Sequence, residues 1–391
     1  MAPGQHILVC EPQFGEFQHA KFNAALLVAG CLAFDRCPAL FFGAQPHMSH
    51  VRSVLRDCPP DPAPEVRWIE VPVRSQMKST WTRTRVLYQT IKRVLDFAAD
   101  NRSRAVIFCS LNAQALFVLK LLLASRRGGC PVLVALHNLY ELLQPDRGLV
   151  NRLFCVRNVL RLPAPPNLRL LILSESIYRQ ALPLGLPRQR CTVIDHPFLW
   201  PPPPATKPPP GDKVRFGFVG ITYKGFSSFV DLARQIVPRY PQGQFVLVGH
   251  ALPPVPPDAE RYVAGCDTKP LSEQEFNDRL RSLTYVLWTA EYDRYRLTAS
   301  ASFLDALAAG KPGIYLANPY VEHYFERMGD IGYLCRTMDD VTRQVEAILR
   351  DFPAERYRRQ TANILKNRHI FDPAVQARRL REAVLARPPV L

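Results

Sequence analysis

The sequence predicts an α/β protein made of two doubly wound domains, each built on a parallel sheet. Three observations lead to this prediction: the length of 391 residues, a regular alternation of short apolar runs with helical spacing, and a dense proline tract that interrupts it. A chain of this length suits two domains of about 150–200 residues each. The apolar fraction of 47% supplies enough side chains for two cores. Strands that alternate with helices are typical of βαβ units.

The first half contains seven short apolar runs that predict strands. They are Ile7–Cys10, Ala39–Phe42, Arg67–Val71, Ala105–Cys109, Val132–Leu136, Leu170–Leu173 and Cys191–Ile194. Four segments between them show helical spacing of apolar residues. They are Ala20–Leu32, Thr80–Ala98, Gln114–Ala124 and Leu149–Leu160. Residues 1–199 are therefore expected to form the first domain.

The proline tract marks the boundary between the domains. Four prolines at 201–204 and three at 208–210 fall within residues 200–212. Such a cluster cannot extend a helix or a sheet and favours stiff polyproline II. We expect a linker over 200–212 and a second domain over 213–370, followed by a C-terminal helix within 371–391.

The second half repeats the alternation. Its expected strands are Val214–Val219, Phe245–Val248, Tyr285–Ala290, Gly313–Leu316 and Gly332–Cys335. Its expected helices are Thr298–Ala309, Val341–Arg350 and Pro373–Ala386. The first of these helices begins with a Thr-Ala-Ser start signal, and Gly310 and Pro312 stand where a helix stop belongs. Ser300 in this first turn is a candidate diphosphate-binding residue, because a helix N-terminus binds anions.

Two segments of the second domain suit a diphosphate. In the segment Val214–Phe226, Gly220 and Gly225 border a strand-to-helix turn that lets the backbone approach a phosphate, and Lys224 adds a positive charge. Arg294 and Arg296 occupy a polar loop before the helix that starts near Ser300, and guanidinium groups can bind a diphosphate in bidentate fashion. The same residues would also fit a structural turn with surface cations.

The stretch Leu304–Pro312, LDALAAGKP, resembles the C-terminal half of GT-B glycosyltransferases, in particular glycosyltransferase family 4. The turn VRFGFVGITYKGF is similar to the nucleotide-sugar element of that family. The resemblance implies two Rossmann-like domains that face each other across a cleft, with the donor on the second domain and the acceptor on the first. It also implies that the final helix packs back toward the N-terminal domain.

The family pattern carries a pair of glutamates that this chain lacks. Asp305 replaces the second glutamate, and Leu297 stands where the first belongs. Ile221 occupies a position that is often arginine in the family. The resemblance implies that Asp305 contacts the donor and makes it a candidate catalytic residue, whereas a carboxylate near a helix start is also explained by the helix dipole.

Two histidines are candidate catalytic residues in the first domain. His137 directly follows the strand Val132–Leu136, where the family often has a histidine that contacts the transferred sugar, although a capped loop histidine is the alternative. His19 lies in HAKFNAALL, which resembles an acceptor-side element of polysaccharide glycosyltransferases, and is favoured over Glu16 as a general base. His196 is interpreted as closing the last strand before the linker.

The composition indicates which kinds of partner the protein binds. The net charge of +16 attracts anions, and an anionic membrane surface is the favoured macroscopic partner because no nucleic-acid-binding motif is present. No apolar run reaches the roughly 18–20 residues that span a bilayer, and the N-terminus lacks a basic region before its apolar run. We expect a cytoplasmic protein, peripheral at the inner membrane face. The ten scattered cysteines are expected to be reduced, and neither a metal nor a cofactor is expected.

These features predict a glycosyltransferase that moves a hexose from a nucleotide-diphosphate sugar to a saccharide acceptor without a metal. The acceptor is expected to be lipid-linked and to belong to cell-surface polysaccharide or glycan synthesis. Retention of configuration is implied by the resemblance alone. Two alternatives remain open: a nucleotide-sugar epimerase or hydrolase of the same fold, and a catalytically silent subunit of a polysaccharide assembly complex.

The change Lys224→Ala tests the diphosphate element. Loss of one charge-stabilising group should raise the donor KM or lower kcat by roughly 10- to 1,000-fold. Steady-state kinetics with the nucleotide sugar measure this effect, and activity close to that of the wild type would remove Lys224 from the site.

Overall fold

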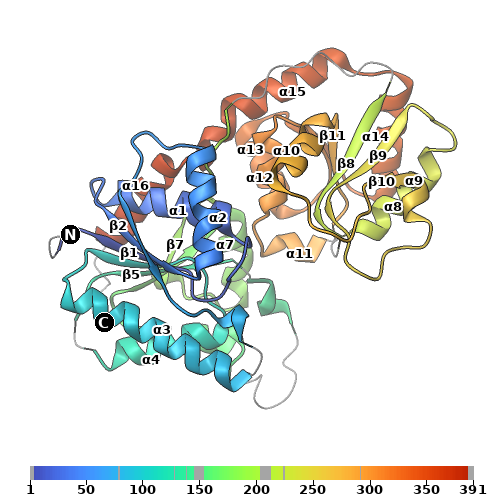
Figure 1. Ribbon diagram of the computed structural model, residues 1–391. Helices are drawn as coiled ribbons and strands as arrows, with labels where there is room; N and C mark the ends of the chain where they lie inside the picture. Colours follow the sequence, from blue (N-terminus) through green and yellow to red (C-terminus); the bar gives the residue numbers. More distant parts are fainter. Residues whose placement is uncertain are drawn as a thin grey trace. The chain divides into compact units, whose positions relative to one another are not determined.

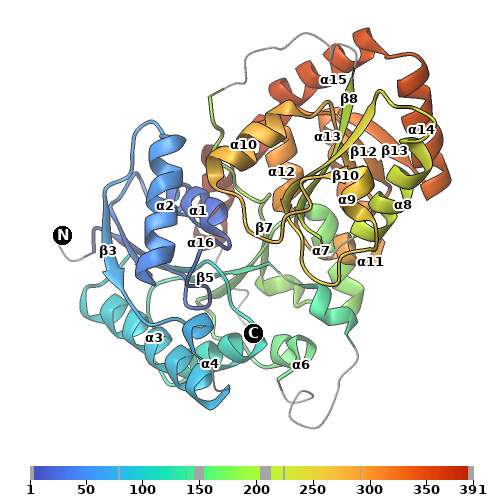
Figure 2. The same ribbon diagram turned by 45° about the vertical axis from the view of Figure 1, so that its right-hand side comes forward.

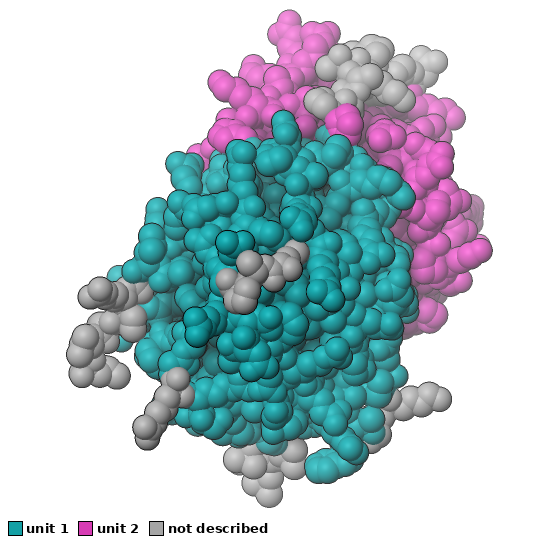
Figure 3. All heavy atoms as spheres, turned by 60° about the vertical axis from the view of Figure 1, so that its left-hand side comes forward, with its two compact units in different colours: residues 1–201, 297–299, 370–391 teal, residues 202–296, 300–369 magenta. Residues whose placement is uncertain are grey.

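The computed structural model describes residues 4–77, 80–126, 128–137, 139–144, 154–202, 213–222, 225–290 and 292–385, except for the side chains of Thr80 and Arg294. The chain divides into two compact units (Figure 3). Unit 1 comprises residues 1–201, 297–299 and 370–391, and unit 2 comprises residues 202–296 and 300–369. Most of the proline tract, residues 203–212, lies outside the described residues.

Unit 1 is built on a seven-stranded sheet in the order β3-β2-β1-β4-β5-β6-β7, in which every neighbouring pair is parallel. The strands are β1 (Ile7–Cys10), β2 (Ala39–Gly43), β3 (Val66–Glu70), β4 (Ala105–Phe108), β5 (Val132–Leu136), β6 (Leu168–Ile172) and β7 (Cys191–Val193). The central strands β1, β4 and β5 are completely buried, because helices cover both faces of the sheet. This strand order is that of a Rossmann-type sheet.

The helices of unit 1 form two layers (Figure 1). One layer holds α1 (Ala20–Ala33), α2 (Gln45–Asp57) and α16 (Pro373–Leu385), and the other holds α3 (Thr80–Asp100) and α4 (Ala113–Ala124). The short elements are η1 (Arg74–Gln76), η2 (Leu139–Leu143), α6 (Val156–Arg161), α7 (Glu175–Ala181), η3 (Leu182–Leu184) and η4 (Arg188–Arg190). Helix α1 is buried on nearly every side, because the sheet, α2 and α16 enclose it.

Helix α16 is joined to unit 1 by polar contacts as well as by packing. The Asp195 carboxylate is 1% exposed and forms an ion pair with Arg379, with 3.2 Å between Oδ2 and the guanidinium nitrogen. The backbone N–H of Asp195 donates to the Gln376 side chain at 2.8 Å. Leu380 is fully buried in the same core as α1. The C-terminal helix is therefore part of the core of unit 1.

Unit 2 is built on a six-stranded parallel sheet in the order β10-β9-β8-β11-β12-β13. The strands are β8 (Val214–Ile221), β9 (Gly243–His250), β10 (Val263–Ala264), β11 (Tyr285–Trp288), β12 (Gly313–Leu316) and β13 (Gly332–Cys335). Two separate apolar clusters cover its two faces.

Helices of unit 2 flank both faces of its sheet (Figure 2). One face carries α8 (Phe226–Ile236), α9 (Ala259–Tyr262) and α14 (Met338–Arg350), and the other carries α10 (Glu273–Ser282), α12 (Ala301–Ala308) and α13 (Pro319–Met328). The remaining elements are α11 (Tyr292–Arg296), α15 (Ala354–Asn367) and η5 (Arg368–Phe371). None of the described helices combines the length and the apolarity that crossing a bilayer requires.

Two expectations for the segment after β11 are wrong. The expected polar loop with Arg294 and Arg296 forms the short helix α11, because Tyr295 packs edge-on against Trp288 with ring centroids 4.4 Å apart. The expected helix Thr298–Ala309 begins only at Ala301, because the Ser300 hydroxyl accepts the Phe303 N–H and makes Ser300 the N-cap.

The change Leu380→Ala tests whether α16 belongs to the core. Removing this buried side chain should lower the free energy of unfolding by about 2–5 kcal/mol. Urea denaturation followed by circular dichroism measures the loss, with the exposed neighbour Glu382→Ala as the control. Equal stability of the two variants would contradict the packing of this helix.

Candidate active site

The loops that follow four strands of unit 1 carry polar side chains at one edge of the sheet. Glu11 follows β1, Ser110 follows β4, His137 follows β5 and His196 follows β7. Because the strands are parallel, their carboxyl ends meet at the same edge, which is where ligands bind in open α/β sheets.

Three histidines gather at this edge. The rings of His19 and His137 stack with centroids 4.2 Å apart and an interplanar angle of 22°. His196 approaches His137 edge-on at 6.1 Å. Phe22 packs against both His137 and His196, with ring centroids at 4.1 and 4.7 Å. We call His19, His137 and His196 the histidine cluster.

His19 adopts an unusual backbone conformation within this cluster. Its φ of 63° places it in the left-handed region, and its side chain does not cap α1, which begins at the next residue. Such a conformation costs about 1–3 kcal/mol and occurs most often at functional sites. The ring Nδ1 is buried without a partner among the described residues. Within the described part of the chain, ring contacts with Phe14 and His137 position the His19 side chain.

The hydrogen bonds of the other two rings define their tautomers. His137 Nε2 lies 3.0 Å from the Cys109 carbonyl, which can only accept, so Nε2 carries the hydrogen and Nδ1 keeps its lone pair. His196 Nδ1 lies 3.1 Å from the Pro197 carbonyl, so its Nε2 keeps the lone pair. Each ring can accept a hydrogen bond from a hydroxyl group.

Burial keeps the histidine cluster neutral. Desolvation, reinforced by the charge of neighbouring histidines, lowers the pKa of His19 to about 4 and that of His137 well below its ordinary value. Desolvation also lowers the pKa of His196 to about 4. Neutral imidazoles can serve as proton acceptors near pH 7. Among the described residues, no group of histidines, cysteines and carboxylates is arranged to hold a metal ion.

A buried carboxyl group supports the loop that carries His19. Glu11 is fully buried and accepts hydrogen bonds from the Ser110 hydroxyl at 2.7 Å, the Gln13 N–H at 2.9 Å and the Asn23 amide at 3.2 Å. Desolvation raises its pKa to about 7, although these hydrogen bonds act in the opposite direction. The carboxyl group joins β1, β4 and α1 beneath the loop.

The network continues to the middle of the same loop. The Asn23 amide also donates to His47 Nε2 at 2.8 Å, and His47 Nδ1 donates to the Glu16 carbonyl at 2.6 Å. Buried polar groups thus anchor the loop between β1 and α1 at its start and at its middle.

Unit 2 places a glycine-bordered turn at the carboxyl end of β8. Gly220 has a φ of +112°, and Gly225, which precedes α8, has a φ of +77°. A Cβ at Gly225 would lie 2.4 Å from the Thr289 carbonyl oxygen, and one at Gly220 would lie 2.8 Å from Ser302 Oγ. The Thr289 hydroxyl donates to the Gly225 carbonyl at 2.7 Å. The turn therefore requires glycine and lies against the strand β11 and the start of α12.

The other donor-side candidates of unit 2 lie on or near α11 and α12. Ser300 caps α12, and Asp305 within α12 is 9% exposed. Arg296 pairs with Asp293 at 3.7 Å, and its Nε is buried without a partner among the described atoms. The backbone of Arg294 lies in α11, whereas its side chain and all of Lys224 lie outside the described residues.

The structure thus brings His19 and His137 into contact and places Gly220 beside the start of α12. The sequence does not single out Glu11 from its loop or predict Ser110, and it indicates only the end of a strand at His196. Glu11, Ser110 and His196 share one feature that could have identified them. Each is a polar residue within three positions of the end of an apolar strand.

The two parallel-sheet units define a GT-B fold, as comparison with solved structures shows. No family model matches the sequence, and no curated protein matches it. The chain is similar in structure to Anabaena HepE (Alr3699) in complex with UDP and glucose, with a TM-score of 0.63, 15% identity, and coverage of 97% of this chain and 99% of that one.

Two further solved structures show the same fold. The lipopolysaccharide outer core galactosyltransferase WaaB aligns with a TM-score of 0.59, 13% identity, and coverage of 97% of this chain and 99% of that one. A putative UDP-N-acetylglucosamine 2-epimerase from Listeria monocytogenes aligns with a TM-score of 0.56, 13% identity, and coverage of 99% of each chain.

The change Glu11→Gln tests the buried carboxyl group. Because the folded-state pKa of Glu11 is raised from 4.5 to about 7, its stabilising contribution is present at low pH and is lost as the pH rises through 7. The neutral glutamine should therefore become more stable relative to glutamate by about 3 kcal/mol between pH 4.5 and pH 8.

Urea denaturation of both proteins across this pH range measures the difference. The histidines are the same in both proteins, so their own titration cancels. A stability difference that does not change with pH would contradict a raised pKa for Glu11.

Proposed function

We propose that the protein is a glycosyltransferase that moves a hexose from a UDP-sugar to a hydroxyl group of a saccharide acceptor. The observation that carries the proposal is the glycine-bordered turn between β8 and α8, in a GT-B fold that Anabaena HepE shares. HepE structures contain UDP or UDP-glucose, which supports a uridine nucleotide as the donor.

On the donor side, the diphosphate lies at the N-terminus of α8. Gly220 and Gly225 hold backbone conformations with positive φ that other residues rarely adopt, and this lets backbone N–H groups approach the diphosphate. Lys224, Arg294 and Arg296 offset the negative charge that develops on the departing nucleotide. Ser300 and Asp305 bind donor hydroxyl groups from the first turns of α12. These positions supply the charge stabilisation without a metal or a cofactor.

On the acceptor side, the histidine cluster supplies neutral proton acceptors. The free lone pairs are on His137 Nδ1 and His196 Nε2, so each ring can orient a sugar hydroxyl. His19 accepts the proton of the attacking hydroxyl, and its buried Nδ1 has no hydrogen-bond partner among the described residues. Retention of configuration follows the family 4 resemblance.

The acceptor is proposed to be lipid-linked and to belong to cell-surface polysaccharide synthesis. The net charge of +16 would draw the protein to an anionic membrane at its cytoplasmic face. The lipopolysaccharide galactosyltransferase among the similar structures is in line with such an acceptor.

An epimerase or hydrolase is the alternative that one observation favours, namely the similarity to a putative UDP-N-acetylglucosamine 2-epimerase. Such an enzyme would convert the nucleotide sugar without an acceptor. A silent subunit is favoured by Leu297, a fully buried apolar residue where the family carries a glutamate.

The change His137→Ala tests the acceptor side. Loss of the lone pair that orients the attacking hydroxyl should lower kcat by about 100-fold while binding of UDP stays unchanged. UDP release from UDP-glucose, measured with and without a panel of saccharide acceptors, reports turnover, and the exposed His369→Ala serves as the control.

Three outcomes would contradict the proposal. Wild-type activity in His137→Ala would remove this residue from the site. Conversion of UDP-sugars at the same rate without any acceptor would indicate an epimerase or hydrolase. Absence of turnover with every donor and acceptor would indicate a silent subunit.

A further inference from the structure

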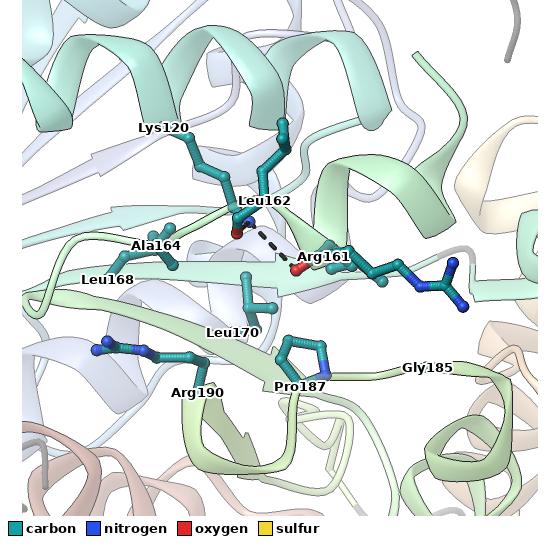
Figure 4. Close-up of a pocket in the computed structure, with 10 residues that line it drawn as sticks. Lys120, Arg161, Leu162, Ala164, Leu168, Leu170, Gly185, Pro187 and Arg190 are labelled. Atoms are coloured by element: carbon teal, nitrogen blue, oxygen red, sulfur yellow. Dashed lines mark hydrogen bonds between the residues drawn. The ribbon is translucent and has the colours of Figure 1, made fainter. Parts of the chain in front are cut away.

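A second site is suggested by a pocket of about 240 Å³ in unit 1 (Figure 4). Its apolar lining comes from Leu160, Leu162, Ala164, Leu168, Leu170 and Pro187. Leu168 is the first residue of β6, and Arg190 directly precedes β7. The pocket therefore lies at the amino ends of the strands, at the edge of the sheet opposite to the histidine cluster.

Three cations line this pocket. Lys120, which is 4% exposed, donates from Nζ to the carbonyl oxygens of Val159 at 2.7 Å and Leu162 at 2.8 Å. These carbonyls lie at the C-terminal end of α6, and their partial negative charge offsets only part of the full positive charge of the Lys120 ammonium group. Arg190 donates to the Pro166 carbonyl at 3.3 Å, and Arg161 completes the set.

The positive charge of the pocket is not neutralised by the described part of the chain. None of Lys120, Arg161 and Arg190 forms an ion pair with a described carboxylate. Burial, with a further contribution from Arg190, lowers the pKa of Lys120 to about 8. Lys120 is the buried member of the set, and a buried charge is normally paired, so its ammonium beside two guanidinium groups favours an anion from outside the chain.

We propose that this pocket binds a small amphiphilic anion, with a phosphate or carboxylate head and a short apolar body. Leu170 and Pro187 lie between the side chains of Arg161 and Arg190, whose guanidinium groups extend outward on either side of this apolar floor (Figure 4). The volume is below the roughly 300–1,000 Å³ of pockets for drug-sized ligands, which limits the body to a few carbon atoms.

Isothermal titration calorimetry of the full chain with hexyl phosphate tests this site. Inorganic phosphate and hexanol are titrated separately as controls, because they represent the head and the apolar body of hexyl phosphate. Hexyl phosphate should bind saturably in the submillimolar to millimolar range and more tightly than either half, because the head and the body contribute together. Absence of saturable binding of hexyl phosphate would overturn the proposal.

Arg190→Gln should weaken the binding about tenfold or more, because one charge-assisted contact is lost. Arg188→Gln is the matched control, since Arg188 belongs to the same short helix η4 and does not line the pocket. Arg161→Gln, at an exposed position, provides a second variant if Arg190→Gln does not fold. Equal affinity in all of these variants and the wild type would overturn the proposal.

A vesicle-binding experiment distinguishes a lipid headgroup from a soluble phosphate ester as the source of the anion. Vesicles with anionic phospholipid that bind the wild type and Arg188→Gln, but bind Arg190→Gln more weakly, would identify a lipid headgroup. Binding of hexyl phosphate without such vesicle binding would identify a soluble phosphate ester. Both results support the site, and neither depends on the donor and acceptor sites of the proposed function.

Discussion

The parallel hydrogen bonding of the strands is the constraint on which the rest of this structure depends. Each crossover returns the chain to the amino edge of its sheet, so the carboxyl ends of successive strands collect their loops at one edge. In unit 1 the register aligns Cys10 of β1 with Phe108 of β4. This alignment lets Glu11 and Ser110, which follow these strands, reach each other across 99 positions of sequence.

Desolvation shifts the pKa values of the groups at this edge of the sheet in two opposite directions. It holds the histidine cluster neutral by lowering the pKa values of its rings, and it raises the pKa of Glu11 toward neutrality. Both effects disfavour charge beneath the loop that carries His19. A site with few fixed charges suits the recognition of sugar hydroxyl groups, which are neutral donors and acceptors.

The sequence predicts most of the fold, because buried parallel strands are short and apolar. All twelve expected strands lie within two residues of observed ones, and β10, a strand of two residues, was not expected. The sequence does not predict helices such as α2, α10 and α15, and it indicates a loop where α11 forms. There the contact between Tyr295 and Trp288 decides the structure, and local polarity does not reveal it.

The candidate site was predicted only in part, since its contacts join distant residues. His19 and His137 were chosen for their positions beside strands and helices, and the structure adds their ring stacking. His196 was missed because its approach to Phe22 depends on the packing of β7 against β6. No local pattern shows that Glu11 is buried, because acidic residues that follow a strand are usually exposed.

The binding of a nucleotide diphosphate is the central claim of this account. Thermal melts with UDP, GDP, ADP, CMP and their sugars, with and without magnesium, test it most directly. A ligand at about 100 times its Kd adds roughly 2.7 kcal/mol and should raise Tm by a few degrees. We expect UDP and a UDP-sugar to raise Tm without magnesium. Unchanged melting with every nucleotide, in a folded sample, would contradict the claim.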